Sequence, residues 1–212
     1  MSKWLNPKSG LGITLIAVAL IALPFVAAMG GQAWVRILNF AILYAFLALG
    51  LNIVVGFAGL LDLGYIAFYA VGAYLWALLA SPHFGLHLPF WVILPLGALV
   101  AGAAGALLGA PTLKLRGDYL AIVTLGFGEI VRIFMNNLNA PINITNGAQG
   151  ITLIDPVMVA DLKFNTTTTL FGLTITGLQK YYFLLVLLAL FVILVNFRLQ
   201  HSRIGRAWQA IR

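Results

Sequence analysis

The chain has 212 residues, of which 62% are hydrophobic and only 8% are charged, and its mean hydropathy is +1.04. Soluble proteins carry about a quarter charged residues, so this composition excludes an ordinary soluble domain and indicates an integral membrane protein. The formal net charge is +7, but the twelve Lys and Arg residues mostly flank apolar runs, which is typical of topology signals rather than of nucleic-acid binding. The lack of cysteine excludes disulfides and thiol chemistry.

The N-terminal apolar run covers residues 11–29, which is long enough to cross a bilayer as a helix. Lys3 and Lys8 precede it, and positive charge on this side predicts a cytoplasmic N-terminus. A cleaved signal peptide is the alternative, because Ala27 and Ala28 resemble a cleavage site. The run is longer than the apolar core of a usual signal peptide, which favours a retained membrane helix.

A second membrane helix is expected over residues 34–55, with Arg36 as an interfacial anchor near its outer end. Four glycines then interrupt the apolar stretch 56–74, and Asp62 stands between two membrane runs, so we expect the helix to break here. Two interpretations stay open for Asp62. In one it is solvated in a tight cytoplasmic turn, and in the other it belongs to a broken helix that lines a transport pathway.

A third helix is expected over residues 65–80, and the Pro- and Gly-rich stretch after it predicts an external loop. His83 and His87 in this loop are four residues apart, a spacing that would let them share a metal on a helix. Because the surrounding prolines and glycine argue against a helix, we expect two solvated loop histidines and no metal site.

The fourth helix is expected over residues 90–110. Ala101, Gly105 and Gly109 recur in it every four residues, which gives a face of small side chains. Such a face lets another membrane helix pack closely against it. We therefore interpret these three residues as helix-packing positions rather than as a functional site.

The fifth helix, expected over residues 118–138, carries charges inside an apolar sequence. Glu129 and Arg132 are spaced i, i+3, so they lie on one helix face and offset each other's charge. Gly126 and Gly128 lower helix propensity just before them and let another backbone approach. The pair is either a structural ion pair or part of a transport route that it lines or gates, and both interpretations stay open.

Residues 139–180 are polar and are expected to form the largest external segment, in which the sequence FGLTITG favours a short strand. A sixth helix is expected over residues 181–197. It opens with two tyrosines at the outer interface and closes with Arg198 on the inner side.

The basic residues test this layout, which is an all-α polytopic membrane protein of about six transmembrane helices with a cytoplasmic N-terminus. Eight of them fall on the predicted cytoplasmic side: Lys3, Lys8, Lys114, Arg116, Arg198, Arg203, Arg206 and Arg212. Four do not: Arg36, Arg132, Lys163 and Lys180. The excess of positive charge on the inner side supports the orientation.

The terminal stretch, residues 199–212, contains a basic amphipathic helix that Ser202 is placed to cap. Its apolar face includes Ile204 and Trp208, with arginines around it. Such a helix lies on anionic lipid or seats its apolar face in the groove of a cytoplasmic partner, and the pattern alone favours neither.

Three segments together resemble one family: GLNIVVGFAGLLDLGYIAFYAVGAY, LKLRGDYLAIVTLGFGEIVRI and SRIGRAWQAIR, with TNGAQGI between the last two. They are similar to the permease of bacterial branched-chain amino acid ABC importers, and specifically to the M-type membrane subunit of the leucine, isoleucine and valine system. The resemblance covers most of residues 40–212. Relatives that carry urea or other amides share much of the pattern, so a urea or amide importer stays open as an alternative.

The resemblance implies an inner-membrane importer built from this permease, a second permease, ATPase subunits and a periplasmic binding protein. It also implies that residues 1–212 are part of one permease domain that continues beyond Arg212, with further spans, and that the external segment 139–180 lies in the periplasm. Residues 199–212 would begin the cytoplasmic region that couples to the ATPases. The candidate coupling residues are Arg203, Ile204, Gly205, Arg206 and Trp208.

The second class of function is a stand-alone ion-coupled carrier or channel, in which Asp62 and Glu129 would be the coupling carboxylates. The chain has no G-x-x-x-x-G-K-[ST] loop, so any ATP use must come from another chain. There is no constellation of Ser, His and acid suited to hydrolysis. We therefore expect a transporter subunit without catalytic residues or cofactors rather than an enzyme.

Overall fold

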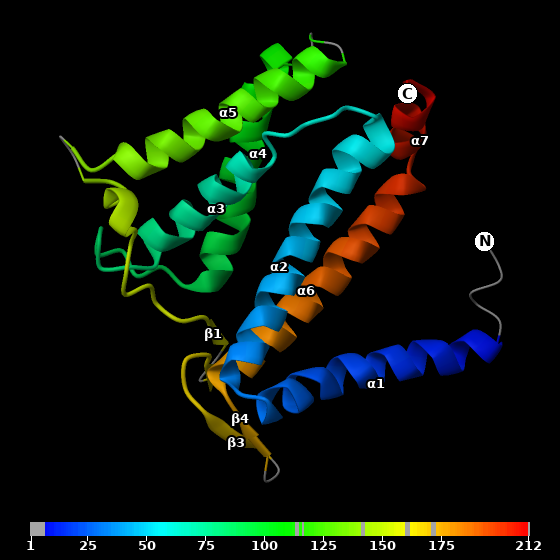
Figure 1. Cartoon of the computed structure of the whole chain (residues 1–212), viewed down its shortest axis with the longest axis vertical. Coiled ribbons are helices and arrows are strands. Elements are labelled where there is room, and N and C mark those ends of the chain that lie inside the picture. The colour runs from blue at the N-terminus through cyan, green and yellow to red at the C-terminus, as the bar shows by residue number, and fades with distance from the viewer. Residues whose placement is uncertain are drawn as a thin grey trace. The chain divides into compact units, whose positions relative to one another are not determined.

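The computed structural model describes residues 7–112, 115, 117–140, 143–159, 162–170 and 173–211, which are mainly helical (Figure 1). The α-helices are α1 Pro7–Met29, α2 Gln32–Asn52, α3 Ile66–Leu79, α4 Phe90–Thr112, α5 Asp118–Asn137, α6 Gly177–Gln200 and α7 Arg203–Ile211. They coincide with the six apolar runs and the amphipathic segment expected from the sequence. The basic residues Lys3, Lys114, Arg116 and Arg212 of the predicted charge pattern lie outside the described residues.

The largest differences from the expected helix bounds are at two starts. α1 begins at Pro7 rather than at residue 11, and α6 begins at Gly177 rather than at residue 181. The added turns have the sequences PKSG and GLQK. Because these turns are polar, an apolar run does not mark them, although they continue the helices.

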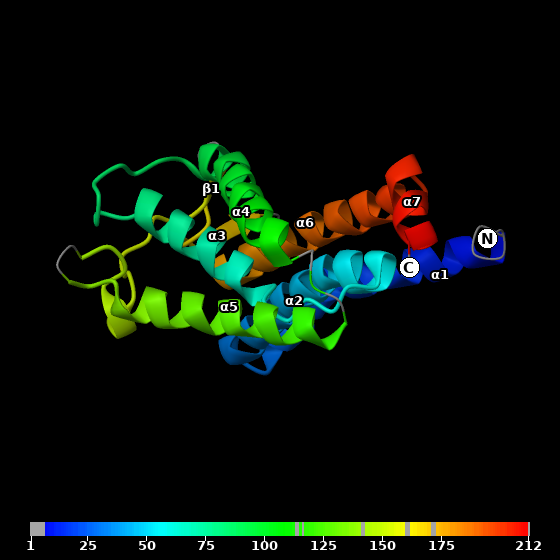
Figure 2. The ribbon, with the colours of Figure 1, turned by 90° about the horizontal axis from the view of Figure 1, so that it is seen from above.

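The chain divides into two compact units. The first unit comprises residues 1–46 and 164–194, and the second comprises residues 47–163 and 195–212. In the first unit, α2 and α6 run alongside each other in the same direction in both views (Figure 1, Figure 2). Near their starts, Asn39 Nδ2 donates a hydrogen bond to the carbonyl of Leu178 at 3.0 Å.

An antiparallel hairpin precedes α6 in the first unit. It pairs β3, Thr168–Leu170, with β4, Leu173–Ile175. The second strand lies within the sequence FGLTITG, so the short strand expected there is confirmed.

Two side chains of α6 donate hydrogen bonds to backbone carbonyls of α1 near Pro24. Pro24 lies inside α1 and has no backbone N–H, so the carbonyl of Leu20 loses its partner within the helix. The hydroxyl of Tyr182 donates to this carbonyl at 3.1 Å, and Gln179 Nε2 donates to the carbonyl of Pro24 at 3.2 Å. Tyr182 is therefore buried against α1, with only 2% of its surface exposed, rather than standing at the outer interface beside Tyr181.

In the second unit, α3 packs against both α4 and α5. The residues buried along α3 are the alanines Ala67 and Ala77. Besides Leu120, the residues buried along α5 are also small, namely Ala121, Thr124 and Gly128. Because these side chains are small, the helices approach each other closely, which is the usual way in which membrane helices pack. At one end of the α3–α4 pair, the rings of Trp76 and Phe90 lie 4.8 Å apart.

The predicted break between the second and third helices is confirmed. After α2 the chain forms one π-helix, η2, over Ile53–Ala58. Gly59 then adopts a left-handed conformation with φ of 69°, and the N–H groups of Gly59 and Leu60 both bond to the carbonyl of Val54. The segment up to α3 has no regular helix, and Asp62 lies in its middle.

The polar segment of the second unit is tied to the loop between α3 and α4. It contains a short 3-10 helix, η3 (Gly147–Gln149), and the paired strands β1 (Met158–Val159) and β2 (Leu162–Lys163). His87 Nδ1 lies 2.5 Å from a carboxylate oxygen of Asp155, and His83 Nε2 lies 2.9 Å from the carbonyl of Asn143. The two histidines are therefore bonded to the polar segment, which corrects the expectation that they are merely solvated. Among the described residues there is no group of three metal-ligating side chains.

The surface of the helices is strongly apolar, with exposed side chains such as Leu99 and Leu107 on α4. Within the described residues, three helical stretches have the length and apolar composition needed to cross a membrane: Gln32–Gly56, Phe90–Thr112 and Gly177–Gln200. Two shorter apolar helices are Thr14–Met29 and Ile66–Leu79. The structure thus supports a helical membrane protein, while the number of six spans stays a prediction.

Candidate functional site

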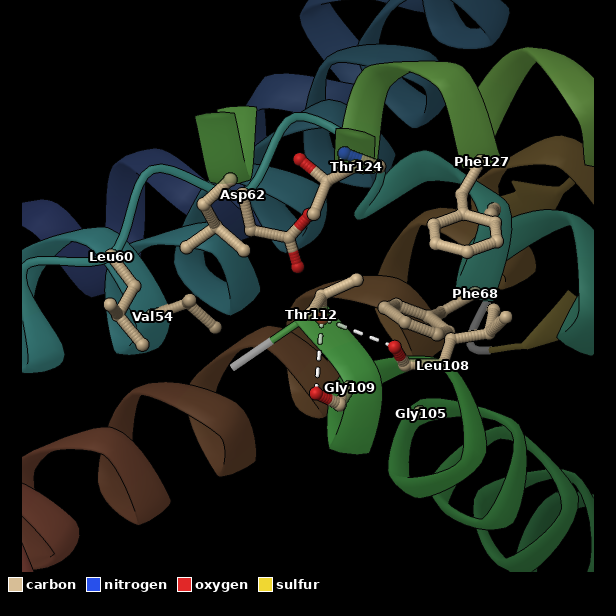
Figure 3. A pocket seen from close by; sticks show the side chains of 13 residues that line it. Val54, Leu60, Asp62, Phe68, Gly105, Leu108, Gly109, Thr112, Thr124 and Phe127 are labelled. Atoms are coloured by element: carbon tan, nitrogen blue, oxygen red, sulfur yellow. Dashed lines mark hydrogen bonds between the residues drawn. The ribbon is translucent and has the colours of Figure 1, made fainter. Parts of the chain in front are cut away.

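A cavity of about 290 Å³ lies in the second unit, where the broken segment after η2 meets α3, α4 and α5 (Figure 3). Its walls are mostly apolar, with side chains such as Phe68, Leu108 and Phe127. Among the described lining residues, only three side chains are polar: Asp62, Thr112 and Thr124. Ligand sites usually have this composition, in which a few placed polar groups interrupt an apolar wall.

The broken segment is held in place by hydrogen bonds to its own backbone and to α5. The Asp62 carboxylate accepts a hydrogen bond from the N–H of Gly64 at 2.8 Å. The hydroxyl of Thr124 accepts one from the N–H of Leu63 at 3.0 Å and donates to the carbonyl of Ala121 at 3.2 Å. Asp62 is half-buried and lines the cavity.

Glycine is required where the broken segment crosses α5. A Cβ atom on Gly64 would overlap the backbone carbonyl oxygen of Thr124, and a Cβ atom on Gly128 would lie 3.5 Å from the Cα atom of Gly64. Gly128 is buried in this crossing. Gly126 is exposed and has open space around it, so the structure brings Gly128, but not Gly126, against another backbone.

Gly105 and Gly109 lie on the side of α4 that faces the cavity. A Cβ atom on Gly105 would lie 3.7 Å from the Phe68 ring, and Gly105 and Gly109 both line the cavity. Ala101 is half-buried farther along the helix. At Gly105 and Gly109 the small residues therefore leave room for an aromatic ring and for the cavity, and a role of the face in helix packing stays a prediction.

Glu129 and Arg132 form a two-bond ion pair on α5, with Arg132 Nε and Nη2 donating to the two carboxylate oxygens at 2.8 and 2.5 Å. Their side chains are 53% and 65% exposed, respectively. They lie along an open groove between α3 and α5 and not in the cavity that Asp62 lines. The structure thus separates the pair from Asp62.

The terminal helix α7 begins as the sequence predicts. Ser202 Oγ accepts a hydrogen bond from the N–H of Gly205 at 3.1 Å, which is a helix N-cap. Gly205 is buried because its Cα lies against the end of α6, where a Cβ atom would overlap the carbonyl oxygen of Leu199. Arg203 and Arg206 are exposed, and Trp208 is half-buried. The side chain of Ile204 lies outside what the structure describes.

The helix α7 contacts an element that forms part of the cavity wall. α7 packs against η2 within the second unit. Val54 of η2 lines the cavity, and its carbonyl holds the first residues of the broken segment. The terminal helix and the cavity wall are therefore joined through one short element.

Apolar helices around a small cavity at a broken helix are features of a membrane transport protein. The sequence matches the model of the family described as branched-chain amino acid transport system / permease component over residues 33–212. The chain belongs to this family, which consists of transport components and not of enzymes. The resemblance noted from the sequence motifs is thereby confirmed.

Two relatives show how far this similarity extends. The high-affinity branched-chain amino acid transport system permease protein LivM of Escherichia coli strain K12 is 44% identical over 217 residues, covering 97% of this chain and 49% of LivM. LivM of Salmonella typhimurium gives the same values. The chain thus spans about half the length of the curated relatives it matches. No solved structure matches the chain.

Two of the polar residues that line the cavity, Thr112 and Thr124, are not predicted from the sequence. Thr112 and Thr124 carry no signal in the sequence, because a threonine in an apolar helix commonly bonds to its own backbone and gives no sign of a site. The available signal is spatial: Thr124 lies on the buried side of α5, two turns into the helix, where the broken segment crosses it.

Proposed function

We propose that the protein is a transmembrane permease subunit of an ATP-driven importer for branched-chain, hydrophobic amino acids in the bacterial inner membrane. Its partners would be a second permease, cytoplasmic ATPase subunits and a periplasmic substrate-binding protein. The family membership and the names of its relatives support this assignment. The observation that carries the pathway is the mostly apolar cavity with one carboxylate at the broken helix.

Six membrane spans with a cytoplasmic N-terminus are part of the proposal. In that layout the second and sixth spans cross the membrane in the same direction. Consistently, α2 and α6 run in the same direction within the first unit (Figure 1). The hairpin β3–β4 before α6 would then lie in the periplasm, and α7 after α6 would lie in the cytoplasm.

Asp62 and the cavity around it are proposed to form part of the translocation pathway. The apolar wall suits a branched aliphatic side chain, because burying such a group there removes apolar surface from water. Irregular backbone at membrane depth is tolerated where it lines a cavity, and Asp62 lies in such a segment. Gly64 and Gly128 would keep this segment close to α5.

Glu129 and Arg132 are proposed to serve as a structural ion pair. Both carboxylate oxygens accept from the same guanidinium, so each charge is neutralised by its neighbour on the helix. The pair lies outside the cavity. The position of Glu129 outside the cavity supports this proposal over a role in which Glu129 and Asp62 act together as coupling carboxylates.

Coupling to the ATPase is proposed to pass through α7. Arg203 and Arg206 of this helix are exposed, and Trp208 is half-buried. Arginine and tryptophan often contribute most of the binding free energy at protein–protein interfaces. A displacement of α7 would act on η2, which it contacts, and through η2 on the wall of the cavity. This route links the site of ATP use in another chain to the pathway in this one.

The test is uptake of labelled leucine into liposomes that contain the protein with its partner subunits. We expect uptake only when both ATPase subunits and ATP are present. Liposomes that lack the ATPases, with and without an imposed ion gradient, are the control. Uptake driven by an ion gradient in the absence of the ATPases would overturn the proposal in favour of an ion-coupled carrier.

A further inference from the structure

Two hydroxyl groups line the cavity, those of Thr112 and Thr124, and both already donate their hydrogen to backbone carbonyls. Thr112 Oγ1 donates to the carbonyls of Leu108 and Gly109, both at 3.1 Å. Thr124 Oγ1 donates to the carbonyl of Ala121 at 3.2 Å. Each hydroxyl has a single hydrogen, so toward the cavity both oxygens act as acceptors.

Asp62 adds a third and stronger acceptor. One of its carboxylate oxygens, Oδ1, accepts from the N–H of Gly64. Among the described residues no side chain forms an ion pair with Asp62, and none donates to its second oxygen, Oδ2. Figure 3 shows Asp62 and Thr124 on one side of the cavity and Thr112 facing them. The described side chains of this cavity thus offer a ligand a negative charge and acceptors, but no donor.

We propose that this cavity binds the ammonium group of a hydrophobic amino acid at Asp62. The carboxylate of the amino acid would point away from the polar side chains of the cavity, which are Asp62, Thr112 and Thr124. An ammonium has three donors and no acceptor, which complements this set. A carboxylate has acceptors only, and it would be repelled by Asp62. This inference rests on the proposed import function and specifies how the substrate would be oriented.

The size and walls of the cavity fit the other end of such a ligand. The volume of about 290 Å³ lies at the lower end of the range of ligand sites, which suits a molecule with the size of one amino acid. Phe68, Leu108, Leu120 and Phe127 supply apolar surface for a branched side chain. A bare metal cation would use the acceptors but would gain nothing from these walls.

The experiment measures binding of labelled leucine to the assembled transporter in lipid nanodiscs, without the binding protein, and its displacement by two analogues. The analogue 3-methylbutylamine keeps the ammonium and lacks the carboxylate, whereas 4-methylpentanoate keeps the carboxylate and lacks the ammonium. We expect the amine to displace leucine at concentrations about ten-fold or more below those that the acid needs, since a hydrogen-bonded charge typically contributes that much. Equal displacement by the two, or better displacement by the acid, would overturn the inference.

A variant provides an independent readout. Asp62→Asn keeps an acceptor for the N–H of Gly64 but removes the charge, so we expect leucine and the amine to bind about ten-fold more weakly or worse. Asp118→Asn makes the same change at an exposed carboxylate in the first turn of α5, outside the cavity, and should bind leucine normally. Unchanged binding by Asp62→Asn would contradict the ammonium site.

Two further measurements distinguish an ammonium site from an inorganic cation site and from a failure of import. Replacing sodium and potassium in the buffer by choline should leave leucine binding unchanged, and a loss or gain of about ten-fold would mean that the acceptors hold an inorganic cation instead. ATP-dependent leucine uptake by the unmodified transporter is measured in parallel. If uptake is absent, the import function itself fails; if uptake is present while Asp62→Asn binds leucine normally, only the ammonium site fails.

Discussion

Gly64 and Thr124 lie so close together that a Cβ atom on Gly64 would overlap the carbonyl oxygen of Thr124. This contact fixes the broken segment on α5 beside the hydrogen bond from Leu63 N–H to the Thr124 hydroxyl. It explains why the glycine is needed here, because the obstacle is backbone and cannot move aside as a flexible side chain would.

We expect Gly64→Ala to destabilise the protein by about 1 to 3 kcal/mol, as overpacking in a close contact does. Gly126→Ala is the matched control on α5, because that glycine has open space around it. It should leave stability unchanged or raise it slightly, since Ala favours helix. Thermal unfolding of the two purified variants in detergent measures the difference. Equal stability of the two variants would mean that the crossing is looser than described.

The Tyr182 hydroxyl bond to the carbonyl that Pro24 leaves open gives a second prediction. Tyr182→Phe should cost about 1 kcal/mol, because the Leu20 carbonyl loses its donor. In a Pro24→Ala background the helix supplies its own N–H to that carbonyl, and the same change should cost less. A double-mutant cycle on thermal stability measures this coupling. If Tyr182→Phe costs the same in both backgrounds, the carbonyl was not the partner that mattered.

The ion pair of Glu129 and Arg132 predicts that the two residues act as a unit. In the membrane, replacing either one by Gln strands the charge of the other, so each single variant should express or assemble poorly. The variant with both residues replaced should recover part of the loss, because no lone charge remains. Yield of folded protein by size exclusion provides the measurement. Simply additive losses would show that each residue has a different partner in the assembled transporter.

The membrane layout predicts which side each terminus occupies. The chain has no cysteine, so single cysteines at Ser2, Thr167 and Ser202 report their own accessibility. Thr167 lies just before β3, and Ser202 lies between α6 and α7. An impermeant thiol reagent added outside intact cells should label only the cysteine at Thr167. External labelling at Ser2 would contradict a cytoplasmic N-terminus.

Trp208 provides the test of coupling through α7. Trp208→Ala should leave membrane insertion and expression unchanged while leucine uptake falls, because the apolar anchor is lost and the helix remains. The same variant should still permit basal ATP hydrolysis, which then no longer responds to substrate. Normal uptake with normal ATPase stimulation would assign the ATPase contact to another surface. Dependence of binding on anionic lipid and on salt would instead indicate a helix that lies on the membrane.

The sequence predicts those features that depend on neighbouring residues. Apolar runs locate the helices, glycines around Asp62 locate the break, and the position of Ser202 before α7 identifies it as a cap. Features that depend on distant segments are not predicted in this way. The contact of Tyr182 with α1 is one example, because its partner, the carbonyl of Leu20 that Pro24 leaves without a donor, lies 162 positions earlier in the chain. The residues next to Tyr182 in the sequence give no sign of it.

The candidate site also depends on contacts between distant segments, so the sequence predicts it only in part. Asp62 and Glu129 are both candidates from the sequence, because each is a carboxylate in an apolar stretch, although only Glu129 has an oppositely charged residue at helical spacing. The structure distinguishes them through their surroundings: Glu129 is paired by its own helix, whereas Asp62 faces a cavity whose other polar groups come from α4 and α5. The i, i+3 spacing predicts the ion pair of Glu129, but no spacing along the chain predicts that Asp62 faces a cavity, because the cavity arises from how the helices pack.

Protection from a thiol reagent tests most directly whether hydrophobic amino acids pass through the cavity lined by Asp62. Leu108 lines the cavity, whereas its neighbour Leu107 on the same helix is 77% exposed. Single cysteines are placed at each position in the assembled transporter, and the labelling rate is measured with and without saturating leucine. We predict that leucine slows labelling at position 108 several-fold and leaves position 107 unchanged. Equal labelling rates at position 108 with and without leucine would contradict passage of the amino acid through this cavity.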